Sequence, residues 1–154
     1  NGLPQFLCVV GPCWPMLAVT LALIIGISLA VFVAYLPGKA VMWTVVGVSL
    51  LCVTSLSLAL TGCTDPGILP RRSEAVDDTW TWSDKGRTFR PRGAVYEAEA
   101  QVVIQSIDHF CPWTGTVIAD GNLKWFHVFV STLCCLIIFV ALLAALSMTT
   151  RERA

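Results

Sequence analysis

Three long apolar runs, separated by polar stretches, dominate the pattern of the chain. They cover about residues 16–36, 41–61 and 125–148, and they contain no Asp, Glu, Lys or Arg. An α-helix rises about 1.5 Å per residue, so each run is long enough to cross a hydrocarbon core of about 30 Å. We therefore predict an all-α integral membrane protein with three transmembrane helices.

The connections between these runs predict three regions. Pro37, Gly38 and Lys39 form a connection so short that the first two spans must be a helical hairpin. The expected regions are a transmembrane hairpin over 1–62, a loop over 63–124, and a third helix with its tail over 125–154.

Within the loop, two segments differ in character. Residues 71–85 are polar, and we expect them to be irregular. Residues 98–107 are mostly apolar and suit a short buried strand or a turn. An apolar stretch in a polar loop must pack against something, either the loop itself or the membrane surface.

The charged residues are gathered in the loop. The chain has a mean hydropathy of +0.74 and a net charge of zero, which gives no indication of a nucleic-acid partner. The basic residues of the loop region are Arg71, Arg72, Lys85, Arg87, Arg90, Arg92 and Lys124, whereas the turn between the first two spans carries only Lys39. The positive-inside rule then places the loop in the cytosol, although Arg151 and Arg153 beside the third span argue against this. The first residue is Asn1 rather than Met, so we expect a fragment or a processed product.

One of the seven cysteines differs from the others in its surroundings. Cys111 lies in the polar loop, whereas the other six lie in or beside the apolar runs, where a cysteine is usually a small buried hydrophobe. No Cys-x-x-Cys pair is present, so the sequence does not predict a disulfide framework.

The stretch Asp108-His109-Phe110-Cys111-Pro112-Trp113 contains the candidate chemistry. A thiol reacts as its thiolate and needs a base or a positive charge nearby. His109 is two residues from Cys111, and Asp108 can orient the imidazole and stabilise its protonated form. The residues alone leave two interpretations open: a Cys-His-Asp catalytic cluster, or a polar turn that contains a cysteine by chance.

This stretch resembles the signature of the Asp-His-His-Cys protein S-acyltransferases, or palmitoyltransferases, with Phe110 in place of the second histidine. Other parts of the chain match the family in the same order. They are Asp65-Pro66-Gly67 after the second run, Arg90-Pro91 ahead of the signature, and Asn122, Trp125 and Phe126 at the start of the third run. The resemblance extends from the first apolar run to the third.

The resemblance implies a two-step transfer of a long-chain acyl group. Cys111 would take the group from acyl-CoA and pass it to a cysteine of a protein at the cytosolic membrane face, with His109 as the general base and Asp108 orienting it. The implied partners are the bilayer, acyl-CoA and such protein substrates. The implied location is an endomembrane (endoplasmic reticulum or Golgi) or the plasma membrane, as a multi-pass protein with a cytosolic loop.

The chain departs from the family at its metal ligands. The family's loop binds two structural zinc ions through cysteines and histidines. Spacing from Cys111 assigns the corresponding positions to Ser83, Gly86, Tyr96, Glu97, Ala100, Val103, Phe110 and Val117. A structural zinc site needs four thiolate or imidazole donors, so we predict a divergent member that binds no zinc and holds no cofactor. Ala100, Val103, Phe110 and Val117 are candidates to replace the metal by apolar packing.

Two alternatives stay open at this point. The first is a catalytically inactive membrane adaptor that keeps the fold, an interpretation that the absence of the zinc ligands and of a fourth span would support. The second concerns Thr149-Thr150-Arg151-Glu152, which reads like a family motif that follows a fourth span, whereas here it follows the third. Either a span-and-loop unit is missing or this match is a coincidence.

Overall fold

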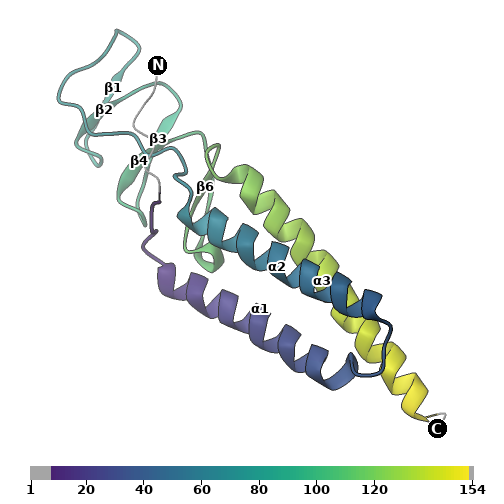
Figure 1. Cartoon of the computed structure of the whole chain (residues 1–154). Helices are drawn as coiled ribbons and strands as arrows, with labels where there is room; N and C mark the ends of the chain where they lie inside the picture. The colour runs from purple at the N-terminus through teal and green to yellow at the C-terminus, as the bar shows by residue number, and fades with distance from the viewer. Residues whose placement is uncertain (1–7, 153–154) are drawn as a thin grey trace.

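Three long helices lie side by side and form most of the molecule (Figure 1). The computed structural model describes residues 8–152, so the ends of the first and last expected regions and Arg153 lie outside the described part. The helices are α1 (Trp14–Tyr35), α2 (Val41–Cys63) and α3 (Leu123–Glu152). The segments that are long and apolar enough to cross a membrane are Trp14–Tyr35, Val41–Cys63 and Leu123–Thr149. They confirm the three predicted spans, with helix ends that differ from the expected ones by a few residues.

The packing of the helices follows from small polar residues on α2. Thr54, Ser57 and Thr61 are buried there, and small side chains let two membrane helices approach closely. The Ser57 hydroxyl donates to the Thr54 carbonyl over 3.0 Å, and the Thr61 hydroxyl donates to the Ser57 carbonyl over 2.7 Å. Helix α2 packs closely along α3, whereas α1 contacts α2 and touches α3 only sparsely.

The loop between α2 and α3 contains three antiparallel hairpins at one end of the helix bundle (Figure 1). Strands β1 (Thr81–Ser83) and β2 (Thr88–Arg90) pair, as do β3 (Ala94–Glu97) with β4 (Val102–Gln105), and β5 (Ile107–Cys111) with β6 (Thr116–Ala119). A short 3₁₀ turn, η1 (Pro112–Thr114), joins the last two strands. The prediction of an all-α chain is therefore wrong in the loop. The expectation of an irregular segment over 71–85 holds for residues 71–80 and fails only at β1. These strands are too short to show a clear period-two pattern.

The β3–β4 and β5–β6 hairpins, together with Ile68 and Leu69, build two small apolar clusters. Leu69, Ala94 and Val103 form one cluster, with Tyr96 packed against it. The other consists of buried Ile104, Val117 and Ala119, bordered by Ile68, Ala100, Val102, Ile107 and Phe110. The expected short strand in 98–107 is therefore present as β4, and its buried side chains supply part of both clusters.

The Asp65-Pro66-Gly67 turn ties α2 to the loop. One carboxylate oxygen of Asp65 accepts hydrogen bonds from the backbone N–H groups of Gly67 and Ile68, both over 2.9 Å. The Gly121 N–H donates to the Pro66 carbonyl over 3.3 Å, and a Cβ at Gly121 would lie only 2.1 Å from the Asp65 carbonyl oxygen. The turn thus holds the end of α2 close to the segment that begins α3, although the hairpins separate the two in the sequence.

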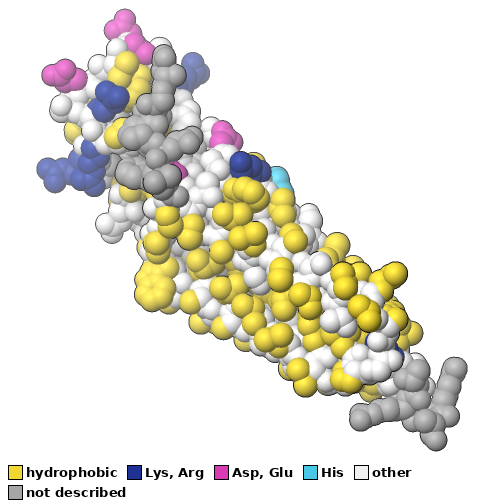
Figure 2. Space-filling view, in the orientation of Figure 1, with side chains coloured by type: hydrophobic (Ala, Val, Ile, Leu, Met, Phe, Trp, Pro, Cys, Tyr) yellow, Lys and Arg dark blue, Asp and Glu magenta, His cyan; other side chains and the backbone are white. Residues whose placement is uncertain are grey.

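The side chains on the visible face separate along the long axis of the molecule (Figure 2). Hydrophobic side chains cover the helices, whereas the acidic and basic side chains gather over the hairpins. This distribution matches a helical bundle in lipid with a polar loop outside it.

Candidate functional site

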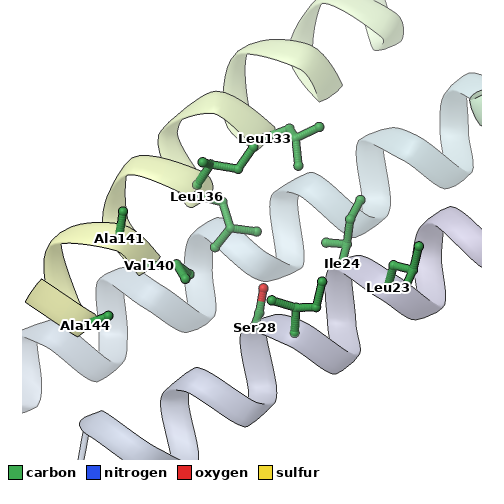
Figure 3. Close-up of a pocket in the computed structure, with 10 residues that line it drawn as sticks. Leu23, Ile24, Ser28, Leu133, Leu136, Val140, Ala141 and Ala144 are labelled. Carbon is green, nitrogen blue, oxygen red and sulfur yellow. The ribbon is translucent and has the colours of Figure 1, made fainter.

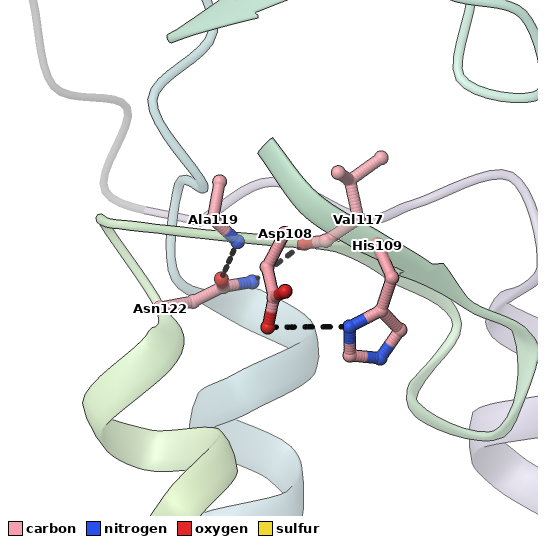
Figure 4. A network of polar contacts seen from close by, with 5 residues as sticks. All are labelled: Asp108, His109, Val117, Ala119 and Asn122. Atoms are coloured by element: carbon pink, nitrogen blue, oxygen red, sulfur yellow. Dashed lines mark hydrogen bonds and ion pairs between the residues drawn. The ribbon is translucent and has the colours of Figure 1, made fainter. Parts of the chain in front are cut away.

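The three predicted site residues lie on strand β5. The Asp108 carboxylate approaches the Nδ1 atom of His109 to 3.4 Å, and the two side chains are 58% and 42% exposed (Figure 4). Cys111 is buried, with a relative exposure of 9%. The expected pairing of Asp108 with His109 is therefore present, and the thiol lies on the same strand.

The register of β5 places His109 and Cys111 on the same face. His109 pairs with Ile118, Phe110 with Val117 and Cys111 with Thr116, without interruption, after an irregularity between Ile107 and His109. Successive side chains of a strand point to opposite faces, so residues two apart share one. The imidazole and the thiol thus occupy neighbouring positions on one face, about 7 Å apart at their backbones.

The turn after Cys111 lies against the first turn of α1. Pro112 opens η1, and the Thr114 hydroxyl donates to the Cys111 carbonyl over 3.1 Å. Gly115 ends the turn with a φ of +76°, a conformation that favours glycine, and a Cβ there would lie 3.1 Å from the Cβ of Leu17. The loop 64–122, which contains the three hairpins, is called the hairpin domain below, and Cys111 lies where it meets the membrane helices.

A fully buried asparagine holds strand β6 in place (Figure 4). The Oδ1 atom of Asn122 accepts from the Ala119 N–H over 3.0 Å, and its Nδ2 donates to the Val117 carbonyl over 2.9 Å. The same Nδ2 donates to the carbonyl of Thr61 in α2 over 3.2 Å. Asn122 thereby links α2, β6 and the start of α3, and β6 pairs with β5, the strand that contains the candidate site residues.

Sequence reasoning missed two of these relationships. Asn122 and Phe126 stood out only as matches to the family. In the structure the Phe126 ring lies edge to face against the His109 imidazole, with ring centres 5.2 Å apart. Asp120-Gly121 ahead of a helix is a turn signal that marks Asn122 as a capping position, but no local pattern indicates the contact with His109.

The residues at the family's zinc positions do not fit a metal. A Cβ at Gly86 would lie 2.6 Å from the Cγ2 atom of Val103 and 3.2 Å from the Ser83 hydroxyl. Tyr96 is the cross-strand partner of Val103, so these four positions converge in the structure. They present a hydroxyl, a phenol and a methyl group rather than the thiolates and imidazoles that zinc requires.

Three of the remaining positions lie in the second apolar cluster. Val117 is a buried member of that cluster, and Ala100 and Phe110 pack against the cluster. Among residues 8–152, no group of three or more His, Cys, Asp or Glu side chains is arranged to hold a metal ion. Apolar side chains thus fill the second place in which the family resemblance implies zinc, and the first place presents a hydroxyl, a phenol and a methyl group.

An apolar groove runs between α1 and α3 (Figure 3). It has a volume of about 410 Å³, within the range of small-molecule sites, and its walls are almost entirely hydrocarbon. Leu23, Ile24 and Ser28 line it from α1, and residues from Leu133 to Ala144 line it from α3. The groove follows from the sparse contact of α1 with α3.

A family model and several individual proteins match this chain, and all of them are protein S-acyltransferases or palmitoyltransferases. The family model of the DHHC palmitoyltransferases matches residues 77–153, which is half of the chain. "Probable protein S-acyltransferase 2" of Arabidopsis thaliana is 29% identical, over 90% of this chain and 46% of its own length. "Palmitoyltransferase ZDHHC18" of Mus musculus is 26% identical over 80% of this chain and 41% of its own length, and "Palmitoyltransferase ZDHHC18-A" of Danio rerio is 28% identical over 62% and 27%.

Two features of these alignments concern length. The chain spans less than half the length of each of these relatives. The alignment with the Arabidopsis protein runs over 187 positions, more than the 154 residues of this chain. That relative therefore carries additional residues inside the matched region.

Proposed function

Because the chain belongs to the DHHC palmitoyltransferase family, we propose that it is a protein S-acyltransferase whose nucleophile is Cys111. The observation that carries the proposal is the placement of His109 and Cys111 on one face of β5, with Asp108 against the imidazole. A nucleophile, a base and a group that orients the base are the parts that covalent acyl transfer needs.

In the first step, His109 takes the proton of the Cys111 thiol. The thiolate attacks the carbonyl carbon of the acyl-CoA thioester, and a new carbon–sulfur bond forms to Cys111. The bond from the carbonyl carbon to the sulfur of coenzyme A breaks, and coenzyme A leaves as a thiolate that accepts the proton from His109. Asp108 stabilises the imidazolium between these two transfers.

In the second step, a cysteine of the protein substrate repeats the chemistry in reverse. His109 accepts the proton of the incoming thiol, whose sulfur attacks the carbonyl carbon held on Cys111. The bond to Cys111 breaks, and the Cys111 thiolate recovers a proton from His109. No metal and no redox change enters either step.

The groove between α1 and α3 is the candidate site for the acyl chain. Leu17, which contacts the turn after Cys111, lies six residues before Leu23 at the groove, a distance of about 9 Å along a helix. An acyl chain on Cys111 would therefore run down α1 into hydrocarbon surroundings. Burial of each CH₂ group contributes roughly 0.8 kcal/mol, which favours a long chain.

The hairpin domain supplies the polar half of the acyl-CoA site. Arg71 and Arg72 are exposed there, and guanidinium groups form strong paired hydrogen bonds with phosphates. In this proposal the loop faces the cytosol, where acyl-CoA and membrane-associated protein substrates reach it. The membrane is an endomembrane or the plasma membrane.

The test is acylation of Cys111 itself. The full chain in membranes is incubated with labelled palmitoyl-CoA, and label released by hydroxylamine is measured. We expect label on the wild type, little on Cys111→Ser, and wild-type levels on Cys134→Ser, which removes an exposed thiol of α3. Equal label on the wild type and Cys111→Ser would reject the enzyme and favour the inactive adaptor.

A further inference from the structure

The aromatic ring of Phe126 is packed against the proposed catalytic base. Phe126 lies in the first turn of α3, far from His109 in the sequence, yet the two ring centres are 5.2 Å apart and the ring planes meet at 68°. Edge-to-face pairs of this separation are a favoured aromatic geometry. We propose that Phe126 is a positioning residue that fixes the plane of the His109 imidazole for acyl transfer, an inference that rests on the function proposed above.

Asp108 alone leaves the imidazole poorly constrained. Its carboxylate meets Nδ1 at 3.4 Å, beyond the usual hydrogen-bond range, and both side chains are about half exposed. An exposed pair of this kind is weak. It also attaches the ring at one atom only, so the ring can still tilt about that contact. A second surface is needed to hold the plane.

Phe126 supplies that surface from a rigid element. Its backbone N–H donates to the Asn122 carbonyl over 3.1 Å, and Asn122 is the buried residue that also binds β6. Strand β6 pairs with β5, the strand that carries His109. The same asparagine therefore connects the base-bearing strand and the ring that packs on the base, which fixes their relative position.

The plane of the imidazole matters for the proton transfer. Nδ1 faces Asp108, which leaves Nε2 to exchange a proton with the Cys111 thiol. The two residues lie about 7 Å apart along the strand, so the imidazole must lean toward Cys111 to reach it. A ring that tilts freely spends less time in that position, and misplacement by about 1 Å can cost about 10²-fold in rate.

A spectroscopic experiment tests the contact without reference to activity. The chain has only two histidines, His109 and His127, so the imidazole Cε1–H region of a ¹H–¹³C spectrum of the full chain in nanodiscs is simple, and His127→Gln assigns it. We expect the His109 resonance to lose its ring-current shift in Phe126→Leu and to keep it in Trp125→Leu. Trp125 is the matched control because its ring contacts Lys124 instead. An unchanged His109 resonance in Phe126→Leu would overturn the inference, whether or not the protein transfers acyl groups.

A kinetic experiment tests the role. At saturating palmitoyl-CoA, we expect the rate of hydroxylamine-sensitive labelling of Cys111 to fall about 10- to 10²-fold in Phe126→Leu, with an unchanged KM for palmitoyl-CoA. Phe126→Tyr keeps the ring and should restore the rate, whereas a merely structural loss would lower stability and labelling in both variants. A wild-type rate in Phe126→Leu, or no rescue by Phe126→Tyr, would overturn the positioning role. Failure of the proposed function is recognised separately, by equal label on wild type and Cys111→Ser.

Discussion

At the scale of single residues, the base and its carboxylate make unequal contributions. His109 exchanges the proton in both steps, whereas Asp108 acts on His109 through a partly exposed contact of 3.4 Å. We predict that His109→Ala lowers the acylation rate of Cys111 by about 10²–10⁴-fold, the usual contribution of a general base. Asp108→Asn should lower the rate less. Time courses of labelling measure both, with His127→Ala as the matched control, and equal rates for His109→Ala and His127→Ala would contradict the assignment.

Asn122 is the residue that does most to hold β6, and through it β5, against α2 and α3. Its side chain makes hydrogen bonds to Ala119, Val117 and Thr61, and it is fully buried. Asn122→Ala removes these three hydrogen bonds, at a cost of about 1–3 kcal/mol for each buried group left unsatisfied. We predict a large fall in the midpoint temperature of unfolding. The measurement is the reaction of the Cys111 thiol with a maleimide as the protein is heated.

A control for Asn122 lies in α3, the helix that Asn122 directly precedes. The Thr132 hydroxyl donates to the Val128 carbonyl of its own helix, so Thr132→Ala leaves no new polar group stranded. Thr132→Ala should melt near the wild type. A wild-type midpoint for Asn122→Ala would show that β6 is held by other contacts.

The residues that the sequence could identify are those whose chemistry is local. Asp108, His109 and Cys111 fall within four consecutive positions, so their type and spacing are enough to indicate a site. Asn122 and Phe126 act through partners elsewhere in the chain, on α2, β6 and β5. Such contacts depend on how the elements pack, and packing leaves no pattern in a single sequence.

At the scale of elements, the spans and the hairpins differ in how strongly the sequence specifies them. A run of about 20 apolar residues has one stable structure in lipid, because only a helix satisfies its own backbone there. The loop strands are three to five residues long. Strands β3 to β6 pack through two apolar clusters that they build together, and β1 and β2 are only three residues long. The sequence therefore predicted the spans and missed most of the hairpins.

The metal content of the hairpin domain tests the replacement of zinc by apolar packing. Val103 and Val117 are almost fully buried at two of the family's ligand positions. We predict little or no stoichiometric zinc in the purified chain, and no change in its thermal midpoint after treatment with a chelator. Elemental analysis measures the zinc content, and the reaction of Cys111 with a maleimide during heating measures the thermal midpoint. One or two zinc ions per chain would contradict the alignment to Cys111.

A gain-of-metal variant serves as the positive control for this prediction. Ser83, Gly86, Tyr96 and Val103 converge in the structure. The combined substitutions Ser83→Cys, Gly86→Cys, Tyr96→His and Val103→Cys would place three thiolates and one imidazole there, which is a complete zinc donor set. This variant should bind about one zinc ion and should lose stability when chelated.

At the scale of the whole molecule, the three-helix bundle is more open on one side than on the other. Helix α2 is packed along α3, but α1 and α3 leave the apolar groove between them. The Arabidopsis relative carries extra residues within the region that it shares with this chain, as expected if an internal span-and-loop unit is absent here. The groove therefore offers apolar walls to an acyl chain on the side where α1 and α3 contact each other least.

The orientation of the whole molecule decides which compartment supplies the acyl donor. Seven of the ten Lys and Arg residues lie between α2 and the start of α3, whereas the opposite turn has only Lys39. Because short loops rich in Lys and Arg stay in the cytosol, we predict that the hairpin domain is cytosolic. Trypsin added to the cytosolic face of sealed vesicles should cleave at exposed Arg71 or Arg72 and leave Lys39 intact until detergent is added. Cleavage at Lys39 before lysis, with the loop protected, would place Cys111 on the lumenal side, away from cytosolic acyl-CoA, and the proposed acyl donor would then be wrong even if the thiol itself were reactive.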